Sequence, residues 1–346
     1  MSSGWNTIES DAGVFTELIE KLNVKGLQFH EFLSIDPETL SEVQPLYGLI
    51  FLFKYRGSEI RQRRVRQQTA SAGAVFGPDV PGAHYDEVSA SIPISEQPDK
   101  GVFFAHQTIQ DACATQAVLS LLLNFPPGQE DVDVGPVIKN FGEFVESFDP
   151  ELRGEAISNS EEIRAVHNSF SRPNPFVDED QNDTERDENN DGLYHFVAYL
   201  PIHGKLYELD GLHPYPIVHD VGGAEVTLES FPALVSKVLM ERVANSPAGE
   251  MRFALLGLTK DPRPMLRAIG DTDGLEREES KRAAWSHENA LRRENYIGLI
   301  NALVRSVSGK LTDAEWQSQV IEAGRSRSQA RIERIKAQKE RNFPEH

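Results

Sequence analysis

Residues 103–124, FFAHQTIQDACATQAVLSLLLN, contain Cys113, the only cysteine in the 346-residue chain. Apolar residues follow Cys113 at intervals of three and four, the spacing of one helix face; they are Ala114, Ala117, Val118, Leu121 and Leu122. We expect a helix that starts near Cys113, with Asp111 as its capping residue. The positive end of a helix dipole favours a thiolate, which makes Cys113 a candidate nucleophile. The alternative is a small buried residue, because free cysteines are among the most buried residue types.

A second stretch, residues 194–211, YHFVAYLPIHGKLYELDG, predicts a β-hairpin. Two apolar, β-prone runs flank His203-Gly204, and a two-residue loop that ends in glycine is typical of a tight hairpin turn. Pairing Ile202 with Lys205 across this loop sets the register of both strands.

This register brings His195 and Asp210 to one face of the hairpin. Asp210 lies opposite Val197, and His195 lies two residues from Val197 on the same strand, so both side chains project from the same face. A carboxylate beside an imidazole fixes the imidazole tautomer and supports the ring as a base. The alternative is an ordinary exposed hairpin face. A single cysteine together with a His–Asp pair is the pattern of a cysteine hydrolase.

Three motifs in these stretches resemble those of the ubiquitin C-terminal hydrolases, the papain-like deubiquitinases. The motifs are HQTIQDACATQA at 106–117, HFVAY at 195–199 and LYELDG at 206–211. Residues 4–31 and 157–170 extend the similarity. The chain is most similar to the proteasome-associated member with a C-terminal helical extension, which residues 293–304, RENYIGLINALV, resemble.

The resemblance implies an α/β, papain-like ubiquitin hydrolase fold with a central antiparallel sheet flanked by helices, plus an α-helical C-terminal extension. It also implies a knotted backbone, one of the rare exceptions to unknotted topology. The implied reaction is hydrolysis of the bond after the C-terminal glycine of ubiquitin, and it needs no cofactor.

The resemblance also assigns roles to four residues. Cys113 is the nucleophile, His195 is the general base and proton donor, and Asp210 orients His195. Gln107, six residues before the cysteine, supplies a side-chain N–H to the oxyanion. Without the resemblance, Gln107 is interpreted as a loop residue bonded to backbone.

Composition narrows the functional classes. Asp and Glu number 54 against 35 Lys and Arg, and the resulting net charge of -19 argues against a general nucleic-acid binder. One cysteine excludes an intramolecular disulfide and a Cys-rich zinc site, and favours a reducing compartment. The N-terminal residues lack a signal pattern, and the apolar run at 46–53 is shorter than the ~20 residues that span a bilayer. We therefore expect a cytoplasmic and nuclear protein that binds neither a metal nor a membrane.

The chain divides into a predicted catalytic domain at 1–260 and a helical extension at 261–346. Within the first, residues 171–193 lack an apolar period and hold eight acidic residues and two arginines. A like-charged run stays solvated, and a loop of this length is often functional. By resemblance it is the crossover loop that passes over the active-site cleft. Residues 61–66 hold four arginines that match a nuclear-localisation pattern, which is also common on solvated faces.

The extension combines an apolar helix face with a basic tail. The apolar face runs from Tyr296 to Val307 and must be buried against something. Residues 325–341 hold seven basic and two acidic residues, a local charge of +5 (7 − 2). The alternative for this tail is a solvated terminal helix. By resemblance, residues 261–346 dock on an adaptor domain of a proteasomal ubiquitin receptor.

Two functions of other classes compete with the deubiquitinase. One is a papain-like thiol hydrolase of another substrate, and the other is a non-catalytic ubiquitin-binding scaffold subunit. The presence of all four candidate residues argues against the scaffold.

Overall fold

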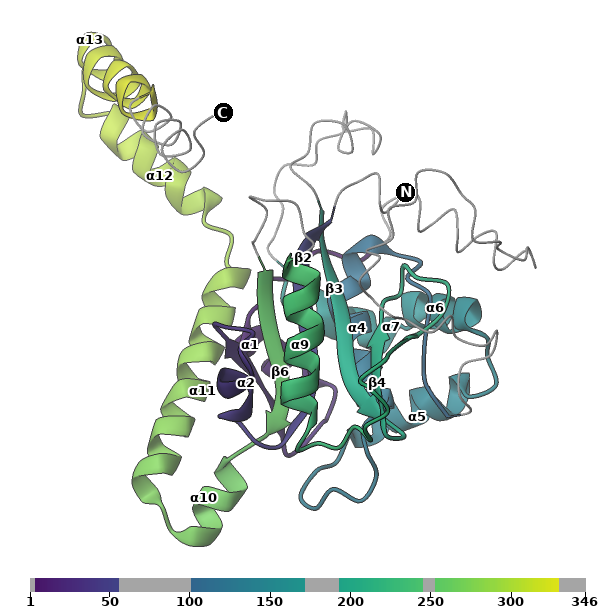
Figure 1. The fold of residues 1–346 in the computed structure, drawn as a ribbon. Coiled ribbons are helices and arrows are strands. Elements are labelled where there is room, and N and C mark those ends of the chain that lie inside the picture. Colours follow the sequence, from purple (N-terminus) through teal and green to yellow (C-terminus); the bar gives the residue numbers. More distant parts are fainter. Residues whose placement is uncertain (1–3, 56–100, 172–192, 245–252, 330–346) are drawn as a thin grey trace, which may run out of the picture. The chain divides into compact units, whose positions relative to one another are not determined.

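The computed structural model describes residues 4–55, 101–171, 193–244 and 253–329 (Figure 1). Its described residues form two compact units that divide between Arg293 and Glu294. The basic cluster at 61–66, residues 172–192 of the predicted crossover loop 171–193, and the tail beyond residue 329 lie outside the described residues.

The first unit is built on one six-stranded sheet in the order β1-β6-β2-β3-β4-β5, with every neighbouring pair antiparallel. The strands are β1 (Leu27–Phe32), β2 (Leu46–Tyr55), β3 (Leu193–Ile202), β4 (Lys205–Leu209), β5 (Ile217–His219) and β6 (Phe253–Lys260). The α/β architecture with a central antiparallel sheet is confirmed. The knotted path stays a prediction.

The predicted hairpin is confirmed as β3 and β4. Ile202 pairs with Lys205, and the register continues to Ala198 opposite Leu209. His203 and Gly204 have φ angles of 48° and 74°. Two successive positive φ angles fit a primed two-residue turn, whose twist matches that of the strands.

Helices cover both faces of the sheet (Figure 1). One face packs against α1 (Ala12–Lys21), α4 (Cys113–Leu123) and neighbouring helices, whereas the other packs against α2 (Pro37–Ser41) and α9 (Phe231–Ala244). Strand β3 contributes to both cores, because alternate side chains point to opposite faces. Phe196 and Ala198 belong to the core beneath α4, and Val197 and Tyr199 belong to the core beneath α9.

Three further helices complete the α4 side: α5 (Gly135–Val145), α6 (Pro150–Asn159) and α7 (Glu161–Asn168). Helix α4 lies among them with nine consecutive buried residues from Ala114 to Leu122. A helix that is apolar nearly all round is stable only in such a core. Its burial fixes the place of Cys113, its first residue.

Helices α10 (Arg263–Ile269) and α11 (Thr272–Arg293) belong to the first unit, although they follow the predicted boundary at 260. Arg282 Nη1 of α11 lies 2.8 Å from Glu20 Oε1, and Asn289 Nδ2 donates to Glu17 Oε2 at 2.7 Å. The Trp285 ring covers Gly13 so closely that an added Cβ would lie 2.5 Å from its Cγ. Helix α11 is therefore packed directly on α1.

The second unit is helical. It contains α12 (Ile297–Ser308), α13 (Asp313–Glu315) and a π-helix, Trp316–Glu322. Thr312 and Glu315 form a reciprocal capping box at the start of α13. The predicted helical extension thus has helices on both sides of the division at Arg293.

We expect the two possible boundaries to behave differently when the chain is shortened. A chain ending at Arg293 keeps the α11–α1 contact, so its free energy of unfolding should change by less than about 0.5 kcal/mol. A chain ending at Lys260 exposes the apolar surface beneath Trp285 and should lose about 1–3 kcal/mol. Urea unfolding of both chains checks this. Equal midpoints would mean that α11 does not stabilise the first unit.

Candidate active site

His195 and Asp210 form a buried hydrogen bond at the start of β3 and the end of β4. His195 Nε2 lies 2.7 Å from Asp210 Oδ1, and the two residues are only 2% and 0% exposed. The hairpin register produces this contact. Ala198 pairs with Leu209, so the next residue, Asp210, lies opposite Val197 and on the same face as His195. The predicted pairing of the two side chains is confirmed.

The backbone after β4 holds Asp210 in place. Asp210 Oδ1 also accepts a hydrogen bond from Leu212 N at 2.9 Å, and its carbonyl accepts one from His213 N at 2.9 Å. A carboxylate that accepts several hydrogen bonds has little freedom to turn away from its partner. Asp210 is therefore held firmly against the His195 ring.

Cys113 is the first residue of α4 and follows a short 3-10 helix, η1 (Gln110–Ala112). Its thiol contacts the backbone of Phe196, the neighbour of His195 on β3. Helix α4 packs on β3, so the central helix brings Cys113 to the strand that carries the imidazole. The predicted helix start is confirmed.

Two sequence-based expectations about Cys113 are wrong. Ala112, not Asp111, is the N-cap residue of α4, and no side chain caps this end. The thiolate is also not favoured, because burial raises the pKa of Cys113 to about 12. The nearby Asp111 charge raises this pKa further. Backbone hydrogen bonds at Ala114, Cys113 and Phe196 lower the pKa, but by less than burial raises it. Desolvation of the charged form here outweighs the helix terminus.

Gln107 lies in a segment that backbone contacts immobilise on both sides. Its own N–H donates to Gly211 O at 2.8 Å, and His106 N donates to Pro150 O at 2.8 Å. Gln107 is 8% exposed. The structure thus ties Gln107 to the residue after Asp210, close to the His195–Asp210 pair.

Gly211 and Gln116 also shape the site, although the pattern of the sequence did not single them out. Gln116 Nε2 of α4 donates to Ala105 O at 2.7 Å. A Cβ at Gly211 would lie 2.3 Å from Gln116 Nε2 and 3.0 Å from Gln107 Cβ. Glycine is therefore required for this close approach. The only sequence signal was its place directly after Asp210.

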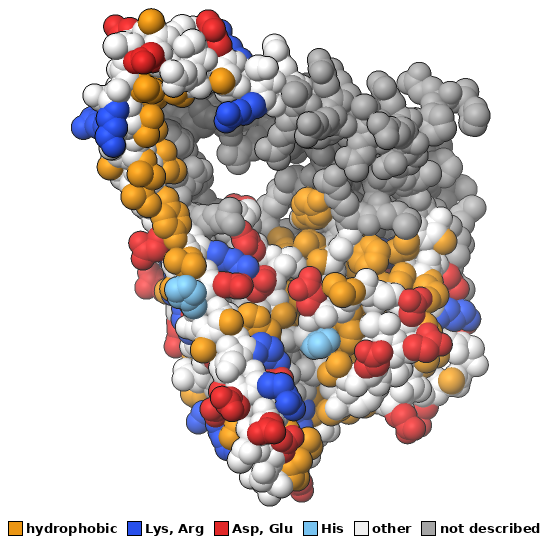
Figure 2. All heavy atoms as spheres, turned by 90° about the vertical axis from the view of Figure 1, so that its left-hand side faces the viewer, with side chains coloured by type: hydrophobic (Ala, Val, Ile, Leu, Met, Phe, Trp, Pro, Cys, Tyr) orange, Lys and Arg blue, Asp and Glu red, His pale blue; other side chains and the backbone are white. Residues whose placement is uncertain are grey.

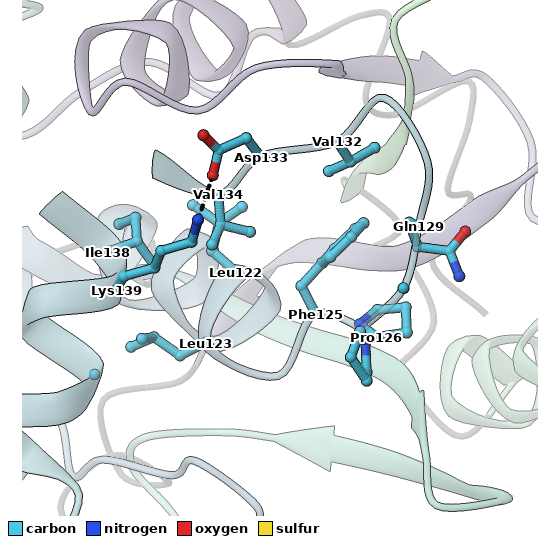
Figure 3. Close-up of a pocket in the computed structure, with 13 residues that line it drawn as sticks. Leu122, Leu123, Phe125, Pro126, Gln129, Val132, Asp133, Val134, Ile138 and Lys139 are labelled. Carbon is cyan, nitrogen blue, oxygen red and sulfur yellow. Dashed lines mark hydrogen bonds and ion pairs between the residues drawn. The ribbon is translucent and has the colours of Figure 1, made fainter. Parts of the chain in front are cut away.

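Other features of the described residues lie apart from this group. No cluster of three or more His, Cys, Asp or Glu suited to a metal ion occurs among them, and none of their helices is long and apolar enough to cross a membrane. A cavity of about 320 Å3 lies at the opposite end of α4 and is lined by 13 residues between Leu122 and Gly142, where Lys139 pairs with Asp133 (Figure 3). None of the four candidate residues lines it.

The family of the chain follows from comparison with known proteins. The family model described as ubiquitin carboxyl-terminal hydrolase, family 1, matches residues 5–244, and a model described as ubiquitin carboxyl-terminal hydrolases matches residues 272–310. The chain belongs to the ubiquitin carboxyl-terminal hydrolases. As a member it is a thiol-dependent deubiquitinase, and the recognition made on the motifs is confirmed.

Relatives of this hydrolase cover most of its length. It is 38% identical to ubiquitin carboxyl-terminal hydrolase 2 of Schizosaccharomyces pombe, over 91% of this chain and 94% of the relative. It is 35% identical to ubiquitin carboxyl-terminal hydrolase ubh-4 of Caenorhabditis elegans, over 90% of each chain. The crystal structure of Trichinella spiralis UCH37 bound to ubiquitin vinyl methyl ester is similar with a TM-score of 0.56 and 28% identity, over 84% of this chain and 99% of that one.

The raised pKa of Cys113 predicts slow alkylation of the resting hydrolase. Only the thiolate reacts, so with a pKa of about 12 the rate with iodoacetamide should rise about tenfold per pH unit from pH 6.5 to 9.5, without a plateau. Mass spectrometry of the single cysteine measures this rate, and glutathione, which levels off near its own pKa, is the control. A plateau near neutral pH would show that the thiolate forms at rest.

Proposed function

We propose that this hydrolase cleaves the bond after the C-terminal glycine of ubiquitin, with Cys113 as nucleophile and His195 as general base and proton donor. Asp210 orients His195, and Gln107 stabilises the oxyanion. The observation that carries the proposal is the buried 2.7 Å contact between His195 Nε2 and Asp210 Oδ1, beside the helix that begins at Cys113. The arrangement has the three parts of a thiol hydrolase: a nucleophile, a base and a group that orients the base.

The tautomer of His195 follows from its partner. The Asp210 carboxylate accepts, so Nε2 carries the hydrogen and donates it. In the neutral ring, Nδ1 then carries the lone pair and is the nitrogen that takes the thiol proton. Asp210 stabilises the imidazolium formed in that step, as carboxylates do in other hydrolytic triads.

Proton transfer and bond formation are coupled in this mechanism. Cys113 Sγ attacks the carbonyl carbon of the terminal glycine while its proton moves to His195 Nδ1. The protonated ring then donates to the leaving amine, which departs and leaves a thioester. Water attacks the thioester, gives its proton to His195, and the thiol is regenerated. Because burial raises the pKa of Cys113 to about 12, the thiol is neutral at rest and His195 must remove its proton during the reaction.

Gln107 acts on the tetrahedral oxyanion through its side-chain amide. The loop that carries it is fixed by hydrogen bonds to Gly211 and Pro150, so the donor is held in position before substrate binds. Preorganised donors are effective for this reason, and removal of one typically costs about 100–1000-fold in rate.

Ubiquitin conjugates at the proteasome are the proposed physiological substrates, in the cytoplasm and nucleus. The similar Trichinella spiralis UCH37 was crystallised with ubiquitin vinyl methyl ester bound to it, which supports ubiquitin as the group recognised.

Residues 261–346 are proposed to dock on a proteasomal ubiquitin-receptor adaptor. The support is the apolar face of α12, whose hydrophobic side chains are 44–57% exposed and are coloured orange in Figure 2: Tyr296, Leu299, Ile300, Leu303, Val304 and Val307.

A non-catalytic ubiquitin-binding scaffold and a thiol hydrolase of another substrate are the competing functions. The buried His195–Asp210 pair favours an enzyme, because a scaffold has no use for an oriented base. Turnover of ubiquitin carrying a C-terminal fluorophore distinguishes the first alternative. Covalent labelling of Cys113 by a ubiquitin electrophile distinguishes the second.

Replacement of Cys113 by alanine should abolish turnover of the ubiquitin–fluorophore substrate, because it removes the nucleophile. Ubiquitin affinity should stay within about twofold, since the change in volume is small. Steady-state fluorescence and calorimetry measure the two quantities.

Asp210→Asn should keep affinity but lower kcat by about 10³–10⁴-fold, by disfavouring the required His195 tautomer. Residual turnover by Cys113→Ala would contradict the catalytic assignment.

The docking proposal predicts a selective effect of charges on α12. Leu299→Asp combined with Leu303→Asp should weaken adaptor binding by at least about 100-fold, because it places two carboxylates in an apolar interface. Turnover of the small ubiquitin substrate should change by less than about twofold. Asn301→Asp, on the same helix, is the charge control. Full adaptor affinity of the double variant would exclude this face as the docking site.

A further inference from the structure

A buried charge network lies next to the His195–Asp210 pair. Glu208 and Asp210 are two residues apart at the end of β4, so their side chains emerge on the same face of the sheet. Both carboxylates are buried, at 4% and 0% exposure. Two buried like charges this close oppose each other and require compensation.

Compensation for Glu208 comes from two partners on other elements. Arg242 of α9 places Nη1 2.7 Å from Glu208 Oε1, and His219 of β5 places Nε2 2.9 Å from Glu208 Oε2. Arg242 also donates to the Tyr199 hydroxyl. Burial raises the pKa of Glu208, but the Arg242 charge and the His219 hydrogen bond outweigh it, and the pKa lies well below its usual range. Glu208 is therefore charged, and its charge is balanced mainly by Arg242.

Arg242 also reaches the catalytic imidazole through one aromatic ring. Its guanidinium carbon lies 4.4 Å from the centroid of the Phe53 ring on β2. The Phe53 ring in turn meets the His195 ring edge to face, with centroids 6.1 Å apart and planes at 83°. A cation on an aromatic face holds the ring in place, and an edge-to-face contact is directional. Helix α9 is thereby connected to the orientation of His195.

We propose that Arg242 is a positioning residue for the hydrolytic reaction, acting on His195 in two ways. It balances the charge of Glu208, so that a second unbalanced carboxylate does not act on the imidazole beside Asp210. It also fixes Phe53 against the imidazole ring, so that the ring stays in line with Asp210. The inference rests on the proposed function, because it assigns Arg242 to the same imidazole.

The groups that face His195 define the expected pH dependence. Asp210 binds the ring directly, Cys113 lies at the adjoining end of α4, and Phe53 covers the ring from β2. The adjacent charge network consists of Glu208 on β4, Arg242 on α9, His219 on β5 and the Tyr199 hydroxyl on β3. Loss of the Arg242 charge leaves this network more negative. A more negative surrounding disfavours the loss of protons that the reaction requires, so the acid limb of kcat/KM should move to higher pH.

The test uses the full-length hydrolase and the ubiquitin–fluorophore substrate over a range of pH. Arg242→Gln should lower kcat by about tenfold or more, leave KM within about twofold, and move the acid limb of kcat/KM to higher pH. Arg242→Lys keeps the charge and should retain the acid limb of the wild type, with a partial loss of kcat. Lys237→Gln removes one positive charge from an exposed position of the same helix and is the matched control.

A double variant separates positioning from mere loss of stability. Glu208→Gln in the Arg242→Gln background removes the unbalanced carboxylate, so it should return the acid limb to its wild-type position and raise kcat at least about threefold above the single variant. Wild-type kcat and pH profile in Arg242→Gln would overturn the inference. So would a double variant no better than the single one, or an equal effect of Lys237→Gln. Absence of turnover by the wild type itself would instead overturn the proposed function.

Discussion

The pairing of Ile202 with Lys205 is the constraint on which the active site depends. Side chains alternate along a strand, so a slip of one residue would send Asp210 to the opposite face of the sheet from His195. The turn at His203-Gly204 prevents this slip, because both residues have the positive φ angles that a two-residue primed turn needs. The same register places Glu208 opposite Tyr199 and creates the buried charge network. This one turn therefore positions both Asp210 and the charge network around Glu208 relative to the His195 ring.

A second constraint is the burial of α4. Packing of the apolar surface of α4 holds Cys113 beside β3, and the same packing partly shields the thiol from water. Desolvation destabilises the thiolate by more than hydrogen bonds from nearby backbone N–H groups stabilise it. Cys113 is thus held at β3 with a thiol that stays protonated at neutral pH.

The sequence predicted the elements of the site better than their electrostatics. The helix start at Cys113 and the hairpin register are local signals, encoded by apolar spacing and by a turn, and both are confirmed. The pKa of the Cys113 thiol depends on tertiary packing around it, and the neighbouring sequence does not predict that packing. The role of Arg242 could not be predicted from sequence for a similar reason, because its partners Glu208, Tyr199 and Phe53 lie on three strands far from α9 in the chain. Helix α11 was predicted to belong to a separate extension because its sequence is charged, yet its Arg282 and Arg293 pair with Glu20 and Glu17 of α1.

The attachment of α11 to α1 determines where the chain leaves the first unit. Arg292 Nη2 lies 3.1 Å from Asp11 Oδ2, at the start of α1, and only residues 294–296 separate α11 from α12. Under the proposed docking, a protein bound to α12 would be joined to the first unit by these few residues alone. Short tethers give high effective concentrations for some geometries and forbid others entirely. Under the proposed docking, the conjugates on such an adaptor would be limited by their distance from the first unit as well as by their chemistry.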